Sequence, residues 1–477
     1  MTVLPDFHQF SVLNTDGTDA IRSAAFRLLE HTGMLVVDSS LRQFLHDHGA
    51  AVNGDRVRLS GQMVSEAISQ APHDVRLWSR DGRAISSADG RPYHGVAPSA
   101  VAVLDYDGQR RRSTYADVAN LTRLADALPG IDFISPPVIA QDCPQADSGL
   151  LTAEAAFSNT HKFCLAFALN WGEAQTWLEM GRCAAGSWAA LAEQPVLGFA
   201  ISPVSPLVLP KETTDILVGV AQRGLPIFTV PGGMAGATSP YTLAGTLVVE
   251  LAEALAVITI AQLMRPGTPN VLGLATAVMD MASGNICLGT PERTLILNAV
   301  APLARSLDMP GYAPVGLTDS FALDEQAGGE KMLSFITQFL SGLPFGSGVG
   351  RCEGGLSCSY EGLVLDHELL QMARRFLSGI RVDAETLAEE VIAQVGPGGN
   401  FLNEAHTLKF LRSDEFRSAR LFNRRALENG GRPAVEAAHA QVERVLASHA
   451  SPVPETMLRE FKSIATGYRQ KTDRSIC

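Results

Sequence analysis

The chain is predicted to fold as an α/β protein built on a (β/α)8 TIM barrel, with an N-terminal helical region and a C-terminal helical extension. The main observation is a change of rhythm near residue 92, where short runs rich in Val, Ile and Phe begin to alternate with longer helical patterns. Eight such runs over about 260 residues favour a closed parallel barrel. The charged, helical pattern after residue 365 indicates the extension.

Residues 1–90 form the predicted N-terminal region. The segment AIRSAAFRLLEHTG (20–33) carries apolar residues at helical spacing and stops at Gly33. Two shorter helices are expected at 41–49 and 60–72, the second capped by Ser60. The first residues contain Asp6 and no basic-then-apolar stretch, so no secretory signal is expected.

The barrel is expected within residues 91–380. An open, doubly wound sheet is the main rival, but neither G-x-G-x-x-G nor G-x-x-x-x-G-K-[ST] follows the first strand-like run. The eight runs are short, apolar and separated by helical patterns. They are predicted as strands at 99–106, 131–140, 162–169, 195–202, 226–232, 269–276, 311–316 and 344–350.

One helical pattern, Leu243–Met264, has the length of a membrane span. Glu250 and Glu253 lie in its interior, and carboxylates are costly at bilayer depth. We therefore expect a buried helix of the barrel and no membrane. In the extension, residues 381–477, the insert GPGGNFLNEAHT (396–407) is expected to be a cap or an interface element.

Composition narrows the class of partner. The 38 basic and 50 acidic residues give a net charge of −12, which argues against nucleic acid, whose affinity comes from Lys and Arg contacts. The seven cysteines are odd in number and scattered, without a C-x-x-C pair. A reduced, cytoplasmic protein is expected.

Acidic and amide side chains crowd the loop that follows the seventh predicted strand. The run GLTDSFALDEQAGGEK (316–331) brings Asp319, Gln326 and Glu330 together before an apolar helix, for which Asp324 could instead be the N-cap. A second glycine-rich run, 346–362, follows the eighth strand. Since barrel enzymes place their reactive groups in the loops after the strands, these two runs are the candidate site.

Metal-dependent and covalent chemistry find little support in the sequence. No H-x-H or H-E-x-x-H pattern occurs, and His367, the nearest histidine to Cys352 and Cys358, lies in the following helix. No protein-bound metal is expected. The G-x-S-x-G elbow is absent, and Arg351 beside Cys352 does not establish a reactive thiolate, so an inert buried thiol is favoured.

Aromatic residues lie near several predicted strand ends, although each could simply pack in the core. A ring of aromatic faces with a nearby carboxylate can hold a quaternary ammonium ion by cation–π attraction. The residues in question are Tyr93, Phe228, Tyr312, Phe321 and Tyr360.

With these residues laid out, the chain resembles the trimethylamine–corrinoid methyltransferase family. The matching segments are 232–256, 318–331, 359–369 and 396–416. The resemblance implies a barrel that moves a methyl group from a methylated amine to the cobalt of a corrinoid (cobalamin) carried by a separate partner protein. It also implies a homo-oligomer. Archaeal trimethylamine enzymes of the family carry pyrrolysine in the segment that matches GRCEGG (350–355), so this chain resembles the pyrrolysine-free branch, which acts on quaternary amines such as glycine betaine.

Leaving-group chemistry favours the same substrate class. A neutral tertiary amine can leave a quaternary ammonium ion without a proton, whereas unactivated trimethylamine would have to expel an amide-like anion. The expected reaction is therefore methyl transfer from a small, betaine-like quaternary amine to a corrinoid protein. A tertiary methylamine donor and a non-catalytic betaine-binding barrel remain the alternatives.

The expected site holds a cation and excludes water. Aromatic faces and a carboxylate, Glu330 or Asp319, would surround the cation, and backbone amides of 232–238 would receive a substrate carboxylate. The predicted catalytic residues are Asp319, Gln326, Glu330 and Tyr360. The predicted substrate-binding residues are Tyr93, Phe228, Met234, Thr238, Phe321, Glu353 and Gly354.

Overall fold

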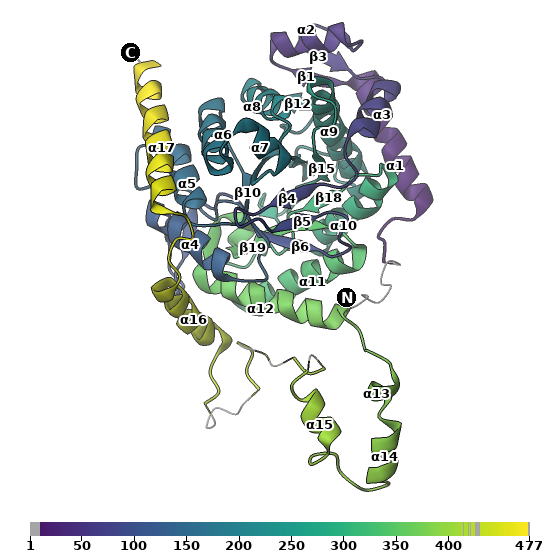
Figure 1. The fold of residues 1–477 in the computed structure, drawn as a ribbon. Coiled ribbons are helices and arrows are strands. Elements are labelled where there is room, and N and C mark those ends of the chain that lie inside the picture. Colours follow the sequence, from purple (N-terminus) through teal and green to yellow (C-terminus); the bar gives the residue numbers. More distant parts are fainter. Residues whose placement is uncertain (1–9, 414, 418, 420, 425–429, 476–477) are drawn as a thin grey trace.

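The computed structural model describes residues 10–475 except 414, 418, 420 and 425–429, so the first nine residues and Cys477 lie outside the described part. It contains the predicted closed barrel (Figure 1). All neighbouring barrel strands pair in parallel, in the order β10-β11-β13-β15-β18-β19-β6-β9. The strands are β6 (Tyr93–Val96), β9 (Phe133–Ile134), β10 (Phe163–Ala166), β11 (Leu197–Ile201), β13 (Ile227–Thr229), β15 (Asn270–Gly273), β18 (Gly311–Ala313) and β19 (Phe345–Val349).

Seven of these strands lie within the predicted runs, and the first does not. The run 99–106 contains β7 (Ala102–Leu104), which lies outside the barrel and pairs with β8 (Arg110–Arg112) in a hairpin. The barrel strand is the shorter β6, which precedes it. The prediction was wrong because the longer apolar run was chosen, although the Asp107–Gly108 turn after it is typical of a hairpin.

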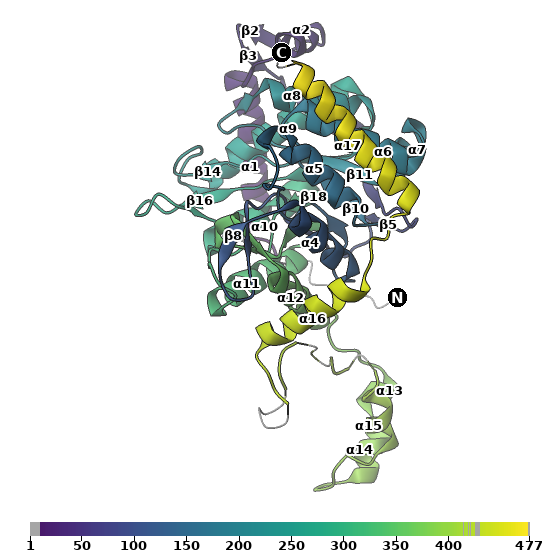
Figure 2. The same cartoon turned by 90° about the vertical axis from the view of Figure 1, so that its left-hand side faces the viewer.

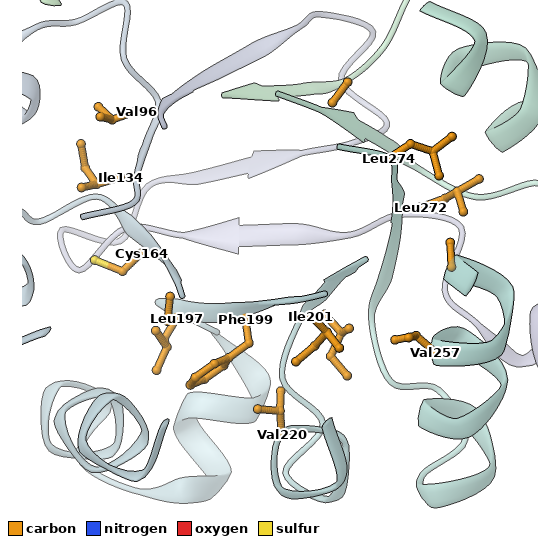
Figure 3. Packing of buried hydrophobic residues seen from close by; sticks show 14 of the residues in the cluster. Val96, Ile134, Cys164, Leu197, Phe199, Ile201, Val220, Val257, Leu272 and Leu274 are labelled. Atoms are coloured by element: carbon orange, nitrogen blue, oxygen red, sulfur yellow. The ribbon is translucent and has the colours of Figure 1, made fainter. Parts of the chain in front are cut away.

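Side chains alternate between the two faces of the barrel wall, as the pleat of a strand requires. One cluster fills the inside and includes Phe133, Phe163, Phe228, Tyr312 and Phe345. The second cluster packs between strands and surrounding helices, where Figure 3 shows side chains such as those of Phe199 and Leu272. The barrel interior is therefore a packed core rather than a channel.

The helices cover the outside of the barrel (Figures 1 and 2). Several begin with the side-chain caps that their sequences predict; Thr114 and Asp117, for example, form a capping box at the start of α4. The surrounding helices are α4 (Tyr115–Ala127), α5 (Gln145–Phe157), α6 (Trp171–Ala185), α7 (Trp188–Glu193), α8 (Lys211–Gln222), α9 (Leu243–Met264), α10 (Pro291–Ser306), α11 (Glu325–Ser341) and α12 (Tyr360–Leu377).

The N-terminal region contains the predicted helices and, in addition, short strands. Ser60 caps α3 as expected, accepting a hydrogen bond from the Met63 amide. Its helical elements are α1 (Thr15–Arg27), a π-helical turn (Leu28–Thr32), α2 (Ser39–Asp47) and α3 (Gly61–Gln70). A sheet of order β12-β1-β3-β2 joins this region to the barrel, and its strands are β1 (Met34–Val36), β2 (Ala51–Asn53), β3 (Arg56–Arg58) and β12 (Val208–Leu209).

Helix α9 is the one candidate membrane span among the described residues, by length and composition. It lies against the barrel and is covered by α1 and α3 (Figure 1). Of its most apolar window, 72% is buried within the protein. Its uniformly apolar surface is therefore explained by packing on all sides.

The C-terminal extension has two parts. An arm of α13 (Ala384–Leu387), α14 (Glu389–Val395) and α15 (Ala405–Phe410) projects away from the barrel (Figures 1 and 2). The chain then returns, and α16 (Ala434–Ser448) packs on α12 and α4 while α17 (Glu455–Ser475) packs on α5 and α6. The division of the chain at residues 90 and 380 stays a prediction.

Candidate functional site

The carboxyl ends of the barrel strands open onto one face, which we call the mouth. Strands β8, β14 and β16 lie at this face, at the left of Figure 2, and the hairpin of β4 (Arg76–Trp78) and β5 (Ala84–Ser86) lies at the opposite end. Two small sheets cover the mouth loops. They contain β14 (Met234–Ala235), β16 (Ala277–Met279) and β17 (Ile286–Cys287) on one side, and β20 (Arg351–Cys352), β21 (Ser357–Ser359), β7 and β8 on the other.

The acidic group predicted after the seventh strand is brought together at the mouth. The Glu330 carboxylate accepts hydrogen bonds from the Thr318 hydroxyl (2.5 Å), the Asp319 amide (2.9 Å) and the Gln326 side chain (2.8 Å). The Asp319 carboxylate accepts the amides of Leu288 (2.6 Å) and Gly289 (2.9 Å). Both carboxylates therefore fix loop backbone, and Asp319 joins the loop after β18 to the loop before α10.

Two residues next to this group, Asp324 and Gly289, have structural roles. The Asp324 carboxylate accepts the Ala327 amide (2.9 Å), which makes it the N-cap of α11. Gly289 packs so closely that a Cβ at that position would lie 2.2 Å from the Glu330 carboxylate. Glycine is required there because the carboxylate occupies the space of a side chain.

The glycine-rich run after β19 is bonded directly to this loop, as its position on the next strand predicts. The amides of Glu353 and Gly354 donate to the carbonyls of Ser320 (2.7 Å) and Thr318 (3.0 Å). The Glu353 carboxylate also accepts the Ser357 hydroxyl (2.5 Å) and pairs with Arg110 (3.1 Å). Both residues have positive φ, 56° for Glu353 and 55° for Gly354, so this turn is held in a left-handed conformation.

Buried polar side chains that the sequence did not mark as functional continue the cross-linking. Glu250 of α9 accepts the Gly233 amide (2.6 Å) and the Thr276 hydroxyl, and so joins the loops after β13 and β15. Burial raises the pKa of Glu250 well above its usual range, which favours the neutral form of this acid. Glu253 accepts the Ser205 hydroxyl (2.7 Å) and the Leu207 amide (2.6 Å) in the same way.

Arg293 of α10 makes the corresponding links with its guanidinium. It donates to the carbonyls of Thr276 (2.7 Å), Leu288 (3.0 Å) and Pro314 (3.0 Å). In the sequence, the two acids inside the apolar helix at 243–264 were the only feature that could have predicted these hydrogen bonds between loops. A single arginine in an amphipathic helix gave no such indication.

The two thiols beside the glycine-rich run are inert, in agreement with the sequence-based interpretation. Burial raises the pKa of the Cys358 thiol to about 12 and raises that of Cys352 as well. Close by, Lys331 and Asp366 form a buried ion pair (2.7 Å), and Asp366 also accepts the Gly350 amide (2.6 Å). Neither cysteine is a nucleophile at neutral pH.

Three of the predicted aromatic contacts are wrong. Tyr93 begins β6 at the end of the barrel opposite the mouth, where its hydroxyl bonds Asp89 and Arg91. Phe228 is fully buried in the barrel core, with its ring 5.4 Å from that of Tyr312. A residue near a strand was predicted to be near the mouth, but Tyr93 lies at the wrong end and Phe228 within the packed interior.

Tyr360 is also misassigned, both as an aromatic face and as a catalytic group. Its hydroxyl donates to the Asp117 carboxylate (2.9 Å), and its ring packs in the layer between the barrel and the helices. Burial and the Asp117 charge raise the pKa of Tyr360 far above its ordinary value. The side chain therefore fastens α12 to α4.

The loop after β13 lies at the mouth, and most of its backbone amides are already engaged. Met234 and Thr238 are half-buried there, and the Met234 amide donates to the Thr238 hydroxyl (2.8 Å). The Gly233 amide is taken by Glu250, and the amides of Ala237 and Thr238 both donate to the Met234 carbonyl (2.9 Å each). Because these donors close much of the loop on itself, the structure does not favour the expected anion cradle, which stays a prediction.

Phe321 stands exposed at the mouth and belongs to a ring of apolar side chains around it. Each member comes from a different loop that follows a barrel strand. We call this set the apolar rim: Leu169, Val204, Tyr241, Met281, Phe321 and Leu356. Exposed apolar side chains gathered on one face are typical of an interaction surface.

Within the described residues, no group of three His, Cys, Asp or Glu side chains is placed to hold a metal ion. No disulfide joins the six described cysteines, and the remaining one, Cys477, is outside that part of the chain. The chemistry available at the mouth is that of hydrogen-bond acceptors, aromatic and apolar surface, and arginine.

Comparison with known proteins places this geometry in context. A family model described as trimethylamine methyltransferase (MTTB) matches residues 2–465. The chain is 31% identical to trimethylamine methyltransferase MttB of Desulfitobacterium hafniense strain DCB-2, over 93% of this chain and 91% of that protein. It is 30% identical to glycine betaine methyltransferase of D. hafniense strain Y51, over 93% and 94%. Trimethylamine methyltransferase MttB of Methanosarcina barkeri is also 30% identical, over 96% and 94%.

Solved structures resemble the fold. The monomethylamine methyltransferase MtmB of Methanosarcina barkeri aligns with a TM-score of 0.50 at 14% identity, covering 98% of this chain and 89% of that one. A hydroxylamine complex of MtmB aligns equally well, with a TM-score of 0.50 at 13% identity over 97% and 88%. At such identity these structures support the barrel architecture alone.

Proposed function

The chain belongs to the trimethylamine methyltransferase (MTTB) family, and we propose that it transfers a methyl group from a small, betaine-like quaternary amine to the cobalt of a corrinoid carried by a partner protein. The relatives named for trimethylamine and for glycine betaine are similar to this chain to almost the same degree, 31% and 30%. Overall identity therefore does not choose the donor, and the choice rests on the chemistry of the mouth.

The observation that carries the proposal is the state of the acids and thiols at the mouth. Asp319, Glu330 and Glu353 act as hydrogen-bond acceptors for loop amides and hydroxyls. The neutral acid Glu250 is completely enclosed, and the Cys358 thiol has its pKa raised to about 12. Such a mouth offers carboxylate charge for a cation but no accessible acid to protonate a leaving amine.

A quaternary amine suits this mouth because its leaving group is already neutral. When the methyl carbon is transferred, the C–N bond breaks and its electron pair stays on nitrogen, giving a tertiary amine. The electron pair of Co(I) forms the new Co–C bond, so the cobalt is formally oxidised to Co(III), and no proton is consumed. The ordinary residues of 350–355, where the resemblance implies pyrrolysine in trimethylamine enzymes, support the same donor class.

The protein contributes position rather than bond-making groups. Hydrogen bonds run from the loop after β18 to its neighbours on both sides, so the mouth loops are fixed before substrate arrives. Phe321 offers an aromatic face, and the Glu330, Asp319 and Glu353 carboxylates offer charge. Gln326 holds Glu330, while Met234, Thr238 and Gly354 shape the adjoining loops.

The apolar rim is the proposed docking surface for the corrinoid protein. Its six side chains are exposed in the loops that follow six of the barrel strands, on the face that a corrinoid protein would have to approach. This surface also argues against a barrel that only binds betaine, since a buried ligand would not require an exposed apolar ring around the entrance.

Self-association is proposed from the arm. None of its three helices, α13 to α15, has a buried residue, and Ile392, Leu402 and Leu408 are exposed. An apolar helical arm without a core of its own is stabilised when another surface covers it. We therefore propose that the chain forms a homo-oligomer through this arm. We also propose that the oligomer is cytoplasmic.

The test is methyl transfer to free cob(I)alamin from a panel of donors, namely glycine betaine, proline betaine, carnitine, choline and trimethylamine. Formation of methylcobalamin is followed by its absorbance, and the demethylated amine is identified by mass spectrometry. A quaternary donor that yields its tertiary amine supports the proposal. Transfer from trimethylamine alone would favour the tertiary-amine alternative, and tight betaine binding without transfer would favour the binding barrel.

A further inference from the structure

Arg351 is a buried cation with unused hydrogen-bond donors at the mouth. It begins β20, with one residue between it and the end of β19, and is only 7% exposed. One guanidinium nitrogen, Nη2, donates to the Pro98 carbonyl just beyond β6, the neighbouring barrel strand. Its Nε and Nη1 are buried and have no partner among the described residues. Three N–H donors are therefore left unsatisfied, which is costly for a buried charged group.

The other buried arginines show what Arg351 lacks. The Arg293 guanidinium is satisfied by three backbone carbonyls. Arg80 also has unpaired nitrogens, but its guanidinium lies over the Phe157 ring, 4.4 Å from the centroid. Arg351 has neither a set of carbonyls nor, among the described residues, an aromatic face. Burial lowers the pKa of the Arg351 guanidinium to about 10, and only the neighbouring Cys358 and Cys352 act in the opposite direction.

A second unpaired donor lies on the same side of the mouth. The Ser135 hydroxyl is buried without a partner in the described structure, directly after β9, which is the next strand beyond β6. Ser135 follows Phe133 by two residues, and Phe133 faces the barrel interior. Because side chains alternate along a strand, Ser135 also points inward.

We propose that Arg351 receives the carboxylate of a zwitterionic substrate, with the Ser135 hydroxyl as an additional donor. The inference rests on the proposed function and narrows its donor class to amines that carry both a quaternary nitrogen and a carboxylate. Four amides of the loop after β13, the other possible receptor, are already engaged within that loop or by Glu250, namely those of Gly233, Met234, Ala237 and Thr238. An anion at Arg351 would satisfy donors that the protein leaves open, and the carboxylates near Glu330 would remain for the cation.

The test compares two ligands that share a trimethylammonium group, glycine betaine with its carboxylate and choline without one. Binding to the full chain is measured by isothermal titration calorimetry for the wild type, Arg351→Met and Arg351→Lys. The control is Arg305→Lys, since Arg305 is an exposed arginine in the last turn of α10 that donates to the Ser341 carbonyl (2.8 Å) far from the mouth. Thermal melting confirms that each variant is folded.

We expect the wild type to prefer glycine betaine, and Arg351→Met to weaken betaine binding by at least about tenfold while leaving choline binding unchanged. Arg351→Lys should lose part of the preference, because the ammonium keeps the charge without the fork of donors, and Arg305→Lys should lose none. Equal binding of both ligands by the wild type, or a preference that survives in Arg351→Met, would overturn the inference. If the wild type transfers methyl groups but binds choline and glycine betaine with equal affinity, only the carboxylate site is refuted. If the wild type prefers glycine betaine and Arg351→Met loses that preference, but no methyl transfer occurs, only the reaction is refuted.

Discussion

The Glu330 carboxylate and the Asp319 amide are joined by a 2.9 Å hydrogen bond, and the Asp319 carboxylate in turn holds the amides of Leu288 and Gly289. The Glu330 side chain of α11 thus fixes the loop after β18, and Asp319 of that loop fixes the loop before α10. The arrangement explains why acids gather after the seventh strand: they accept backbone donors that would otherwise be unsatisfied at the mouth.

Replacing Glu330 should reduce turnover more than substrate binding. Glu330→Ala removes three hydrogen bonds and releases the loop, so we expect kcat for methyl transfer to cob(I)alamin to fall by about tenfold to a hundredfold. Glu330→Gln should be intermediate. Glu325→Ala, on the exposed first turn of the same helix, is the control. A rise in KM at unchanged kcat would instead show that Glu330 acts mainly by its charge on the cation and not by fixing the loop.

Glu250 should tolerate loss of its charge but not loss of its oxygen atoms. Since burial keeps it neutral, Glu250→Gln should change the free energy of unfolding by less than about 1 kcal/mol. Glu250→Ala leaves the Gly233 amide without its acceptor and opens a cavity, so a loss of about 3 kcal/mol is expected in urea unfolding. If both variants were equally destabilised, an ionised Glu250 would be indicated.

Lys162 should make stability increase at high pH. Burial lowers its pKa to about 8, although its ammonium donates to the carbonyls of Ala125 and Leu128 (2.9 Å each). An unfolded lysine titrates near about 10.4, so between these two values the unfolded chain binds more protons and folding gains free energy as pH rises. Relative to Lys162→Met, the wild type should gain about 2 kcal/mol of unfolding free energy between pH 7.5 and 10.5. A constant difference would contradict the buried-lysine account.

The arm should be needed for self-association and not for folding of the barrel. Ile392→Asp combined with Leu402→Asp places charges on two exposed apolar positions, and we expect a lower molar mass by light scattering with an unchanged melting temperature. Glu390→Ala on α14 is the control. An unchanged mass in the double variant would show that the oligomer, if any, uses another surface.

Much of the barrel could be predicted because the spacing of apolar residues along the sequence indicates which faces of each strand and helix are buried. Runs such as 195–202 and 344–350 are largely apolar and contain no charged residue, as is typical of strands buried on both faces, and helices of the expected length separate them. The strand Tyr93–Val96 was missed because four residues that include His94 and Gly95 carry no such signal. The strands of the N-terminal region are equally short, and one of them, β1, pairs with β12, which lies far away in the sequence.

The site was predictable at the level of loops and less so at the level of side chains. The contact between the loops at 316–331 and 346–362 follows from adjacent parallel strands, and Asp319, Gln326 and Glu330 are indeed together. A sequence pattern does not say in which direction a side chain points. Tyr360, for example, starts a helix at the mouth, but its side chain turns toward Asp117. Arg351 was noticed only for its neighbouring cysteine, because a missing partner is a property of the folded chain.

The central claim is that the donor is a quaternary amine whose leaving group needs no proton. The most direct measurement supplies glycine betaine or trimethylamine, one at a time and in excess, to the purified protein with cob(I)alamin and follows methylcobalamin formation. The account predicts methylation with glycine betaine, release of dimethylglycine, and no rate above the donor-free background with trimethylamine. Methylation by trimethylamine at a rate equal to or above that with glycine betaine would contradict it.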